Sequence, residues 1–153
     1  MTARPPHHMK IIHTEIDINA PASVIWRHLT DFSSYHQWNT FVTSAEGTLE
    51  TGERLRITVT PDGAKPMTFR PVVTRFQPNL ELRWLGRLAG LPFLFTGEHS
   101  YRMESIDKSV TRFVQEECFR GILVPIVWKS MSAGTRAGFE KMNLDLKKRS
   151  EDG

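Results

Sequence analysis

Four polar side chains in the C-terminal part of this chain have the residue types and spacing that acid–base chemistry needs. His99 and Tyr101 lie two residues apart in one segment, and Gln115 and Glu117 lie two apart in a later one. A carboxylate beside a histidine holds the ring in one tautomer and favours its charged form, so the pair can act as acid and base. Tyr101 could then donate to a developing oxyanion. Alternatively, the four groups only satisfy one another at the polar end of a binding cavity, because buried polar groups are paired whether or not they catalyse.

The segments that hold these residues are predicted to form a β-hairpin. Residues 94–104 and 110–120 alternate side chains with a period of two, which is typical of strands. A three-residue turn at 107–109 would place the polar residues opposite one another on the inner face. The expected partners are His99 with Glu117 and Tyr101 with Gln115. A slip of one pair would place His99 opposite Gln115 instead.

Residues 125–149 predict one long amphipathic helix, long enough to span a small domain. Its inward stripe follows spacings of three and four residues: Trp128, Met131, Thr135, Phe139, Met142 and Leu146. Pro125 suits the first turn, where its missing N–H costs nothing. Two interpretations of the stripe are open. Methionine and aromatic side chains occur in ordinary cores, but they also suit adaptable spaces, in which case the helix covers a cavity.

The rest of the chain reads mostly as strands, with two short helices near its beginning. Strands are expected at residues 10–19, 41–49, 53–60, 67–76 and 80–85, and short helices at 22–30 and within the aromatic-rich connection 31–39. Pro71 interrupts the strand at 67–76, which predicts a bulge or an edge position. The segment 86–92 contains two glycines and a proline and is expected to be a loop. This order predicts an α+β fold in which the long helix lies along an antiparallel sheet.

The composition is that of an ordinary globular chain. With 153 residues, 39% hydrophobic and 24% charged, it is expected to form a single domain over residues 10–150, after a disordered tail at 1–9. The net charge of +3 comes from dispersed Lys and Arg without an aromatic-interleaved basic motif, so nucleic-acid binding is not expected. No apolar run approaches the length of a membrane span.

Cofactors and metal ions are not expected either. The single cysteine, Cys118, excludes an internal disulfide and any Cys-based zinc site, and it fits a reducing cytoplasm. His99 and Glu117 would need a third ligand to bind a metal ion. The sequence contains no Gly-rich phosphate loop, no HExxH and no GxSxG motif. We expect a cytoplasmic protein that is a monomer or a weak homodimer.

Several stretches of the sequence resemble the START/Bet v 1-like superfamily, also called SRPBCC, and within it the polyketide cyclase/dehydrase-like proteins. The resemblance covers residues 10–149 and rests on IDINAPASVIW at 16–26, DFSSYHQWN at 31–39, LRWLG at 82–86, GEHSY at 97–101, TRF at 111–113 and ECFRG at 117–121. It implies a helix-grip fold, in which a seven-stranded antiparallel sheet wraps around a long C-terminal helix and two short helices follow the first strand. It also implies an internal cavity, which members use for lipids, sterols, polyketides or other hydrophobic molecules.

Three functions are consistent with these observations. The first is binding of a small lipid-, sterol- or polyketide-like ligand between the sheet and the long helix, with the four polar side chains orienting its polar end. The second is a polyketide cyclase or dehydratase in which His99 and Glu117 are the acid–base pair and Tyr101 is a further catalytic candidate. The third is a protein-interaction module, as in relatives that regulate chaperones. An apolar patch on the outer sheet face would support the third, but outward residues such as Glu98 and Arg102 argue against one.

The side chains expected to line the ligand site come from the helix stripe, the hairpin and two earlier tryptophans. They are Trp38, Trp84, Phe95, His99, Tyr101, Phe113, Gln115, Glu117, Phe119, Trp128, Met131, Thr135 and Phe139. A few polar groups among many apolar ones is the usual composition of a small-molecule pocket. For each apolar residue in this set, simple packing in the core is the alternative interpretation.

Overall fold

A computed structural model of the chain describes residues 9–91 and 93–152. Its elements follow in the order β1 (Met9–Ile18), α1 (Ala22–Thr30), η1 (Phe32–Ser34), α2 (Tyr35–Trp38), β2 (Val42–Glu46), β3 (Arg56–Val59), β4 (Met67–Phe69), β5 (Val72–Gln77), β6 (Glu81–Arg87), η2 (Leu88–Gly90), β7 (Thr96–Ser105), β8 (Thr111–Arg120) and α3 (Val124–Glu151). The expected tail at 1–9 lies outside the described residues except for Met9, which begins β1, and Pro92 of the expected 86–92 loop also lies outside them.

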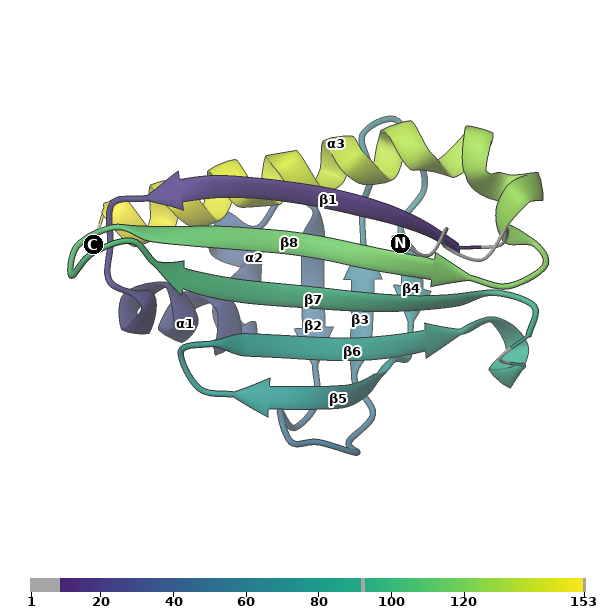
Figure 1. Ribbon diagram of the computed structural model, residues 1–153, viewed down its shortest axis with the longest axis horizontal. Coiled ribbons are helices and arrows are strands. Elements are labelled where there is room, and N and C mark those ends of the chain that lie inside the picture. Colours follow the sequence, from purple (N-terminus) through teal and green to yellow (C-terminus); the bar gives the residue numbers. More distant parts are fainter. Residues whose placement is uncertain (1–8, 92, 153) are drawn as a thin grey trace, which may run out of the picture.

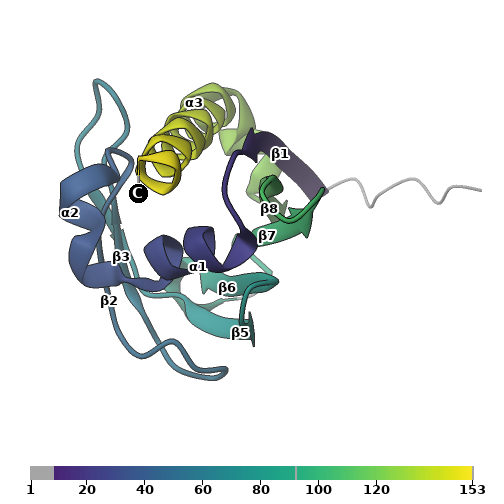
Figure 2. The ribbon, with the colours of Figure 1, turned by 90° about the vertical axis from the view of Figure 1, so that its left-hand side faces the viewer.

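The strands form antiparallel sheets that curve around α3 (Figures 1 and 2). Five strands pair in the order β1-β8-β7-β6-β5 and three in the order β2-β3-β4. Backbone hydrogen bonds join the two sheets, because Leu55 N–H donates to the Pro71 oxygen and Gly52 N–H to the Val73 oxygen, each at 2.8 Å. Figure 2 looks nearly along α3 and shows the strands curving from β1 round to β3, with α3 along the remaining side. This arrangement is the helix-grip fold.

Residues 9–91 and 93–152 contain eight strands in two sheets, where the resemblance implied seven in one. The extra division falls at Pro71, which separates β4 from β5 within the stretch expected as one strand at 67–76. Proline cannot donate to a strand ladder, so a strand ends or bends where its N–H would be needed. The expected 86–92 loop also begins differently. β6 continues to Arg87 and the short turn η2 follows, with Ala89 and Gly90 at positive φ of 52° and 72°.

The β7–β8 hairpin has the predicted register. His99 lies opposite Glu117, and Tyr101 opposite Gln115, without a slip. The turn has a local origin, because the Asp107 carboxylate accepts hydrogen bonds from the backbone N–H groups of Ser109 and Val110 at 2.8 and 2.9 Å. An aspartate that bonds to the backbone just after it is a common turn former. The turn therefore sets the register that brings the four polar side chains to one face.

Burial of α3 changes along its length. In the C-terminal half the predicted stripe residues Phe139, Met142 and Leu146 are at most 2% exposed. In the N-terminal half Trp128, Met131 and Thr135 are only half-buried. Gly138 explains part of the difference, because a Cβ there would lie 2.2 Å from Cε2 of Phe41. Its missing side chain lets α3 approach that ring closely. The helix is therefore tightly enclosed toward its C-terminus and more open toward its N-terminus.

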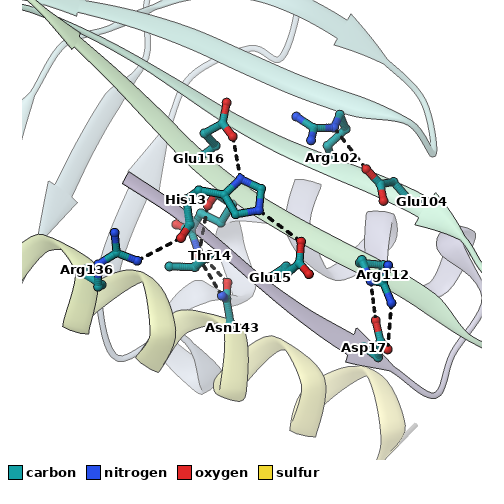
Figure 3. A network of polar contacts seen from close by, with 11 residues as sticks. His13, Thr14, Glu15, Asp17, Arg102, Glu104, Arg112, Glu116, Arg136 and Asn143 are labelled. Carbon is teal, nitrogen blue, oxygen red and sulfur yellow. Dashed lines mark hydrogen bonds and ion pairs between the residues drawn. The ribbon is translucent and has the colours of Figure 1, made fainter. Parts of the chain in front are cut away.

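Polar contacts tie α3 to the neighbouring strand β1 (Figure 3). The Asn143 amide donates to Thr14 Oγ1 at 2.9 Å, and the Arg136 guanidinium donates to the backbone oxygen of His13 at 3.0 Å. These two hydrogen bonds hold the helix along the sheet edge.

On the outward face of β1 the His13 ring lies 2.6 Å from the Glu116 carboxylate, and this hydrogen bond is the largest contribution to a raised pKa of His13.

Candidate functional site

The polar residues of the hairpin belong to one buried hydrogen-bond network that also includes Thr14 and Asn143. Gln115 Nε2 donates to Asn143 Oδ1 at 2.8 Å and to the Phe139 backbone oxygen at 3.3 Å. The Thr14 hydroxyl accepts from Asn143 and donates to the Gln115 backbone oxygen at 3.1 Å. Gln115, Asn143 and Thr14 are at most 6% exposed, so water does not compete for these groups. The network joins β1, β8 and α3.

The network determines which nitrogen of His99 holds a proton. A backbone carbonyl can only accept, so the bond to Phe139 orients the Gln115 amide with Nε2 toward α3 and Oε1 toward His99. Oε1 lies 3.1 Å from His99 Nε2, which must therefore donate. The other nitrogen, Nδ1, faces Glu117 Oε2 at 3.2 Å. A hydrogen bond across that contact needs one proton, held either by the His99 ring or by the Glu117 carboxyl group.

Glu117 is the more accessible member of this pair. Its side chain is 19% exposed, against 6% for that of His99. A Cβ at Gly97 would lie 2.5 Å from Glu117 Oε1, so this glycine leaves the space that the carboxylate occupies. Proton transfer to or from a bound molecule would therefore pass through Glu117, with His99 behind it as its hydrogen-bond partner.

Aromatic rings enclose His99. Trp84 stacks on the imidazole with ring centroids 5.5 Å apart, and the Tyr101 centroid lies 4.5 Å away. Phe139 of α3 meets the imidazole edge-on at 4.8 Å. Phe113 stacks on Tyr101 from β8 at 5.9 Å. The structure therefore brings Trp84, Tyr101 and Phe139 together around the imidazole, with Phe113 on the far side of Tyr101.

Tyr101 and Tyr35, the only tyrosines in the sequence, are both fully buried. Burial raises the pKa of Tyr101 well above its usual value, and the neighbouring Tyr35 and Glu117 add to this effect. Burial, followed by the negative charge of Asp31, likewise raises the pKa of Tyr35. The Tyr101 hydroxyl donates to the Met142 sulfur at 3.8 Å. A role as oxyanion donor would require it to leave that contact.

Alkaline titration of the folded protein is expected to show no tyrosinate absorbance near pH 10. Each phenol has a folded-state pKa above its unfolded value of about 10, so the neutral form persists while the chain is folded. The stability linked to these phenols is complete below that pH and is lost as the pH rises further, because unfolding then releases both protons. Absorbance and circular dichroism should therefore change together. Chain unfolded in guanidinium provides the control, and tyrosinate appearing near pH 10 in the folded protein would contradict the burial of these residues.

The remaining predicted ligand residues lie around the start of α3 and at α2. Phe95, Phe119 and Trp128 form a second aromatic group, with successive ring centroids 5.7 and 5.8 Å apart. Met131 packs against the core, and Thr135 is half-buried in the same half of α3. Trp38 makes its ring contact with Tyr35 instead, edge-on at 5.1 Å. The predicted residues thus divide into a closed cluster around His99, a second aromatic group at the start of α3 in which Phe119 is buried and Phe95 and Trp128 are half-buried, and Trp38 on α2.

Thr14 and Asn143 belong to the network but not to the site residues that the sequence predicts. Thr14 lies between Ile12 and Ile16 on the inner face of β1, and Asn143 lies one turn after Phe139 on the buried side of α3. A polar residue within an apolar face was the available signal, because such a group needs a buried partner. Their partnership could not be inferred from spacing, since they are 129 positions apart.

Two hollows on the described part of the molecule lie outside the space between α3 and the hairpin. The larger, about 280 Å³, is open to the outer sheet face and is lined by Leu85, Arg87, Thr96, Glu98, Cys118 and Arg120. The smaller, about 70 Å³, lies beside Gly134 and Gly138 of α3. The space around His99 is filled by the rings and the network described above. A ligand that reached it would have to displace side chains.

A long helix gripped by a curved antiparallel sheet is the architecture of START/Bet v 1-like proteins, and solved structures of that architecture match nearly the whole chain. The Zhui aromatase/cyclase from Streptomyces sp. R1128 has 16% identity and a TM-score of 0.76, with 94% of each chain covered. A START superfamily protein from Mycobacterium smegmatis has 20% identity and a TM-score of 0.69, covering 95% of this chain and 98% of that one. Norcoclaurine synthase from Thalictrum flavum has 15% identity and a TM-score of 0.69, covering 94% and 95%. At these identities the likeness concerns the fold.

The chain belongs to the family described as polyketide cyclase / dehydrase and lipid transport, whose model matches residues 9–151. None of the curated proteins matches the sequence. Within residues 9–91 and 93–152, no helix is both long and apolar enough to cross a bilayer. The family description covers both an enzymatic activity and the transport of lipids, so the chemistry has to be argued from the residues of this chain.

Proposed function

We propose that the protein binds a small hydrophobic ligand between the β7–β8 hairpin and the N-terminal half of α3. The observation that carries this proposal is the change in burial along the inner stripe of α3, from the enclosed Phe139 to the half-buried Trp128 and Met131. A helix that served only to close a core would bury its apolar stripe along its whole length. Partly exposed methionine and aromatic side chains are suited to adaptable apolar contacts.

The polar end of the ligand would lie against Glu117. On β8, Glu117 lies two residues from Phe119, which belongs to the second aromatic group, and two residues from Gln115 of the buried network. The Glu117 carboxylate could accept a hydrogen bond from a ligand hydroxyl, while Phe119 and Trp128 contact the apolar body. His99 would hold the carboxylate in place through the contact between Nδ1 and Oε2. These groups favour an apolar molecule with one hydrogen-bond donor.

Native mass spectrometry of the protein as purified from cells tests this proposal. We expect additional mass from a bound hydrophobic molecule, which extraction would identify. Trp128→Ala should weaken rebinding of that molecule about tenfold, because a large apolar contact is lost. Leu144→Ala, an exposed position on the same helix, should leave binding unchanged. A protein free of ligand that also gains no stability from fatty acids, sterols or aromatic polyketide-like compounds would contradict the proposal.

A second candidate function, a cyclase or dehydratase, is favoured by the proton arrangement at His99. An imidazole that faces an accessible carboxylate, as His99 Nδ1 faces Glu117, is the kind of pair that moves protons on a bound carbonyl compound. The two functions differ in the effect of His99→Ala. Turnover that this variant abolishes while ligand binding persists would establish catalysis. Binding that only weakens or broadens, without turnover in the unmodified protein, would leave the ligand-binding function.

The outer face of the larger sheet does not favour the interaction-module alternative. Arg83 forms ion pairs with Glu81 at 2.5 Å and Glu98 at 3.4 Å, and Arg102 lies 3.6 Å from Glu104. A face bearing these charged pairs lacks the extended apolar character that such a module would present.

A further inference from the structure

One end of the molecule exposes a group of large apolar side chains, here called the apolar tip. Its members are Leu88, Leu91, Phe93, Ile122 and Ile126, which are 42% to 75% exposed. They lie on the segment from η2 toward β7 and on the segment from β8 into α3, both at the right-hand end of Figure 1. Backbone hydrogen bonds join the segments, from Ile122 N–H to the Phe93 oxygen and from Leu123 N–H to the Leu94 oxygen, each at 3.1 Å. The tip is therefore one surface rather than a set of scattered residues, and such surfaces mark interaction sites.

Positive charge borders the apolar tip. The segments 86–97 and 118–139 contain Arg87, Arg120, Lys129 and Arg136 but no Asp or Glu. Arg87, Arg120 and Lys129 form no ion pair with any residue in the described ranges. Arg87 directly precedes Leu88, Arg120 lies two residues before Ile122, and Lys129 lies three residues after Ile126, so each cation is set back from the tip.

Arg87 and Arg120 also lie close together across the sheet. Both pair with Thr96, from β6 and β8 respectively, so they occupy one row across three strands. They form part of the rim of the 280 Å³ hollow on the outer face. The carboxylate in that hollow, Glu98, is paired with Arg83 at 3.4 Å. The two guanidinium groups are therefore placed to receive an anion from outside.

We propose that the apolar tip docks on an anionic lipid bilayer. The five apolar side chains would enter the interface, while Arg87, Arg120 and Lys129 contact lipid phosphates. A bilayer surface has anionic groups just outside an apolar layer, and the tip has the complementary order, with apolar side chains at its end and cations set back. An uncharged apolar partner would cover the cations without pairing them, which is costly. This surface adjoins the open half of α3, but its docking does not depend on whether the interior binds a ligand.

Co-sedimentation of the full chain with lipid vesicles tests the proposal. Vesicles of phosphatidylcholine alone are compared with vesicles that also contain about 30 mol% phosphatidylglycerol, at low and at high salt. We expect binding to the anionic vesicles that falls as salt is raised, because salt screens the attraction. Binding to neither vesicle, or equal binding to both, overturns the proposal.

Matched variants locate the docking surface. Phe93→Ser with Ile126→Ser should weaken vesicle binding at least about tenfold, whereas Leu80→Ser with Ile106→Ser, at similarly exposed positions at the opposite end, should have no effect. Arg87→Gln with Arg120→Gln should weaken binding about 25-fold, since each basic residue near the surface contributes about fivefold. Lys65→Gln with Lys108→Gln makes the same change of net charge at exposed positions elsewhere and should not weaken vesicle binding.

All replaced residues are exposed, and thermal unfolding verifies that each variant is folded. Tip variants that bind vesicles like the unmodified protein overturn the proposal. The proposal is also overturned if light scattering shows a dimer that the tip variants dissociate while their vesicle binding is unchanged. The tip would then be an interface between two copies. Native mass spectrometry of the tip variants reports separately on the interior ligand, so failure of one proposal is distinguishable from failure of the other.

Discussion

Replacing Gln115 by leucine is expected to lower the free energy of unfolding by about 3–4 kcal/mol. Leucine fills a similar volume to glutamine, but it leaves the His99 Nε2–H without its acceptor and the Asn143 Oδ1 without its donor. Both groups are in the interior, at 5% and 2% exposure, so water cannot replace the lost bonds. Denaturant unfolding at neutral pH measures the change. Gln77→Leu on β5, where the glutamine is exposed, is the control and should change stability by less than about 0.5 kcal/mol.

A double-mutant cycle identifies the network as the cause. Asn143→Leu alone should also be destabilising, because it removes partners from both Gln115 and Thr14. The double variant should cost less than the two single changes added together, by about 1–2 kcal/mol, since the bond between the two amides is lost only once. Additive effects, or a cost below about 1 kcal/mol for Gln115→Leu, would mean that the network is not formed as described.

Adding a single methyl group at Gly138 is expected to destabilise the protein by about 2 kcal/mol. The Cβ of Gly138→Ala would lie 2.2, 2.5 and 2.6 Å from three atoms of the Phe41 ring, which is buried and packs edge-on against Phe139. Overpacking of this kind costs about 3 kcal/mol, and the better helix propensity of alanine offsets about 1 kcal/mol of it. For a chain of this length the midpoint of thermal unfolding should fall by about 4–8 °C.

Gly134 provides a matched control on the same helix. A Cβ there would meet no atom within 4 Å, so Gly134→Ala should show only the propensity gain and raise stability by about 1 kcal/mol. The two substitutions are chemically identical and lie one turn apart, so opposite signs would isolate the contact with Phe41. Equal effects at both positions would mean that α3 does not approach the ring as the structure shows.

These expected results concern the closed half of α3, whereas the proposed ligand would lie against its open half. The buried network and the contact at Gly138 anchor the C-terminal half to β1, β8 and Phe41. Trp128 and Met131 lack comparable enclosure. A helix anchored at one end can adapt to a bound molecule at the other without losing the interactions that hold the fold together.

Much of the hairpin and the long helix could be predicted from the sequence, because both depend on local periodicity. Alternation with period two defined the faces of β7 and β8, and a turn at Asp107 predicted the pairing of His99 with Glu117 but left a slip of one pair open, which the structure excludes. Spacings of three and four defined the inward stripe of α3. The strand at 67–76 was predicted too long, because the ladder partners on either side of Pro71 are set by the fold rather than by the local pattern.

The sequence by itself determined the helix-grip class, through its resemblance to a known family, and the faces of the main elements, including the polar cluster on the inner face of the hairpin. Only the tertiary structure decided that Asn143 and Thr14 complete the network, because their bond joins residues 129 positions apart. It also decided that α3 is closed at one end and open at the other. A stripe shows which side chains face inward but not how closely the helix lies against its neighbours. That distance depends on contacts such as Gly138 with Phe41, which exist only once the whole interior has packed.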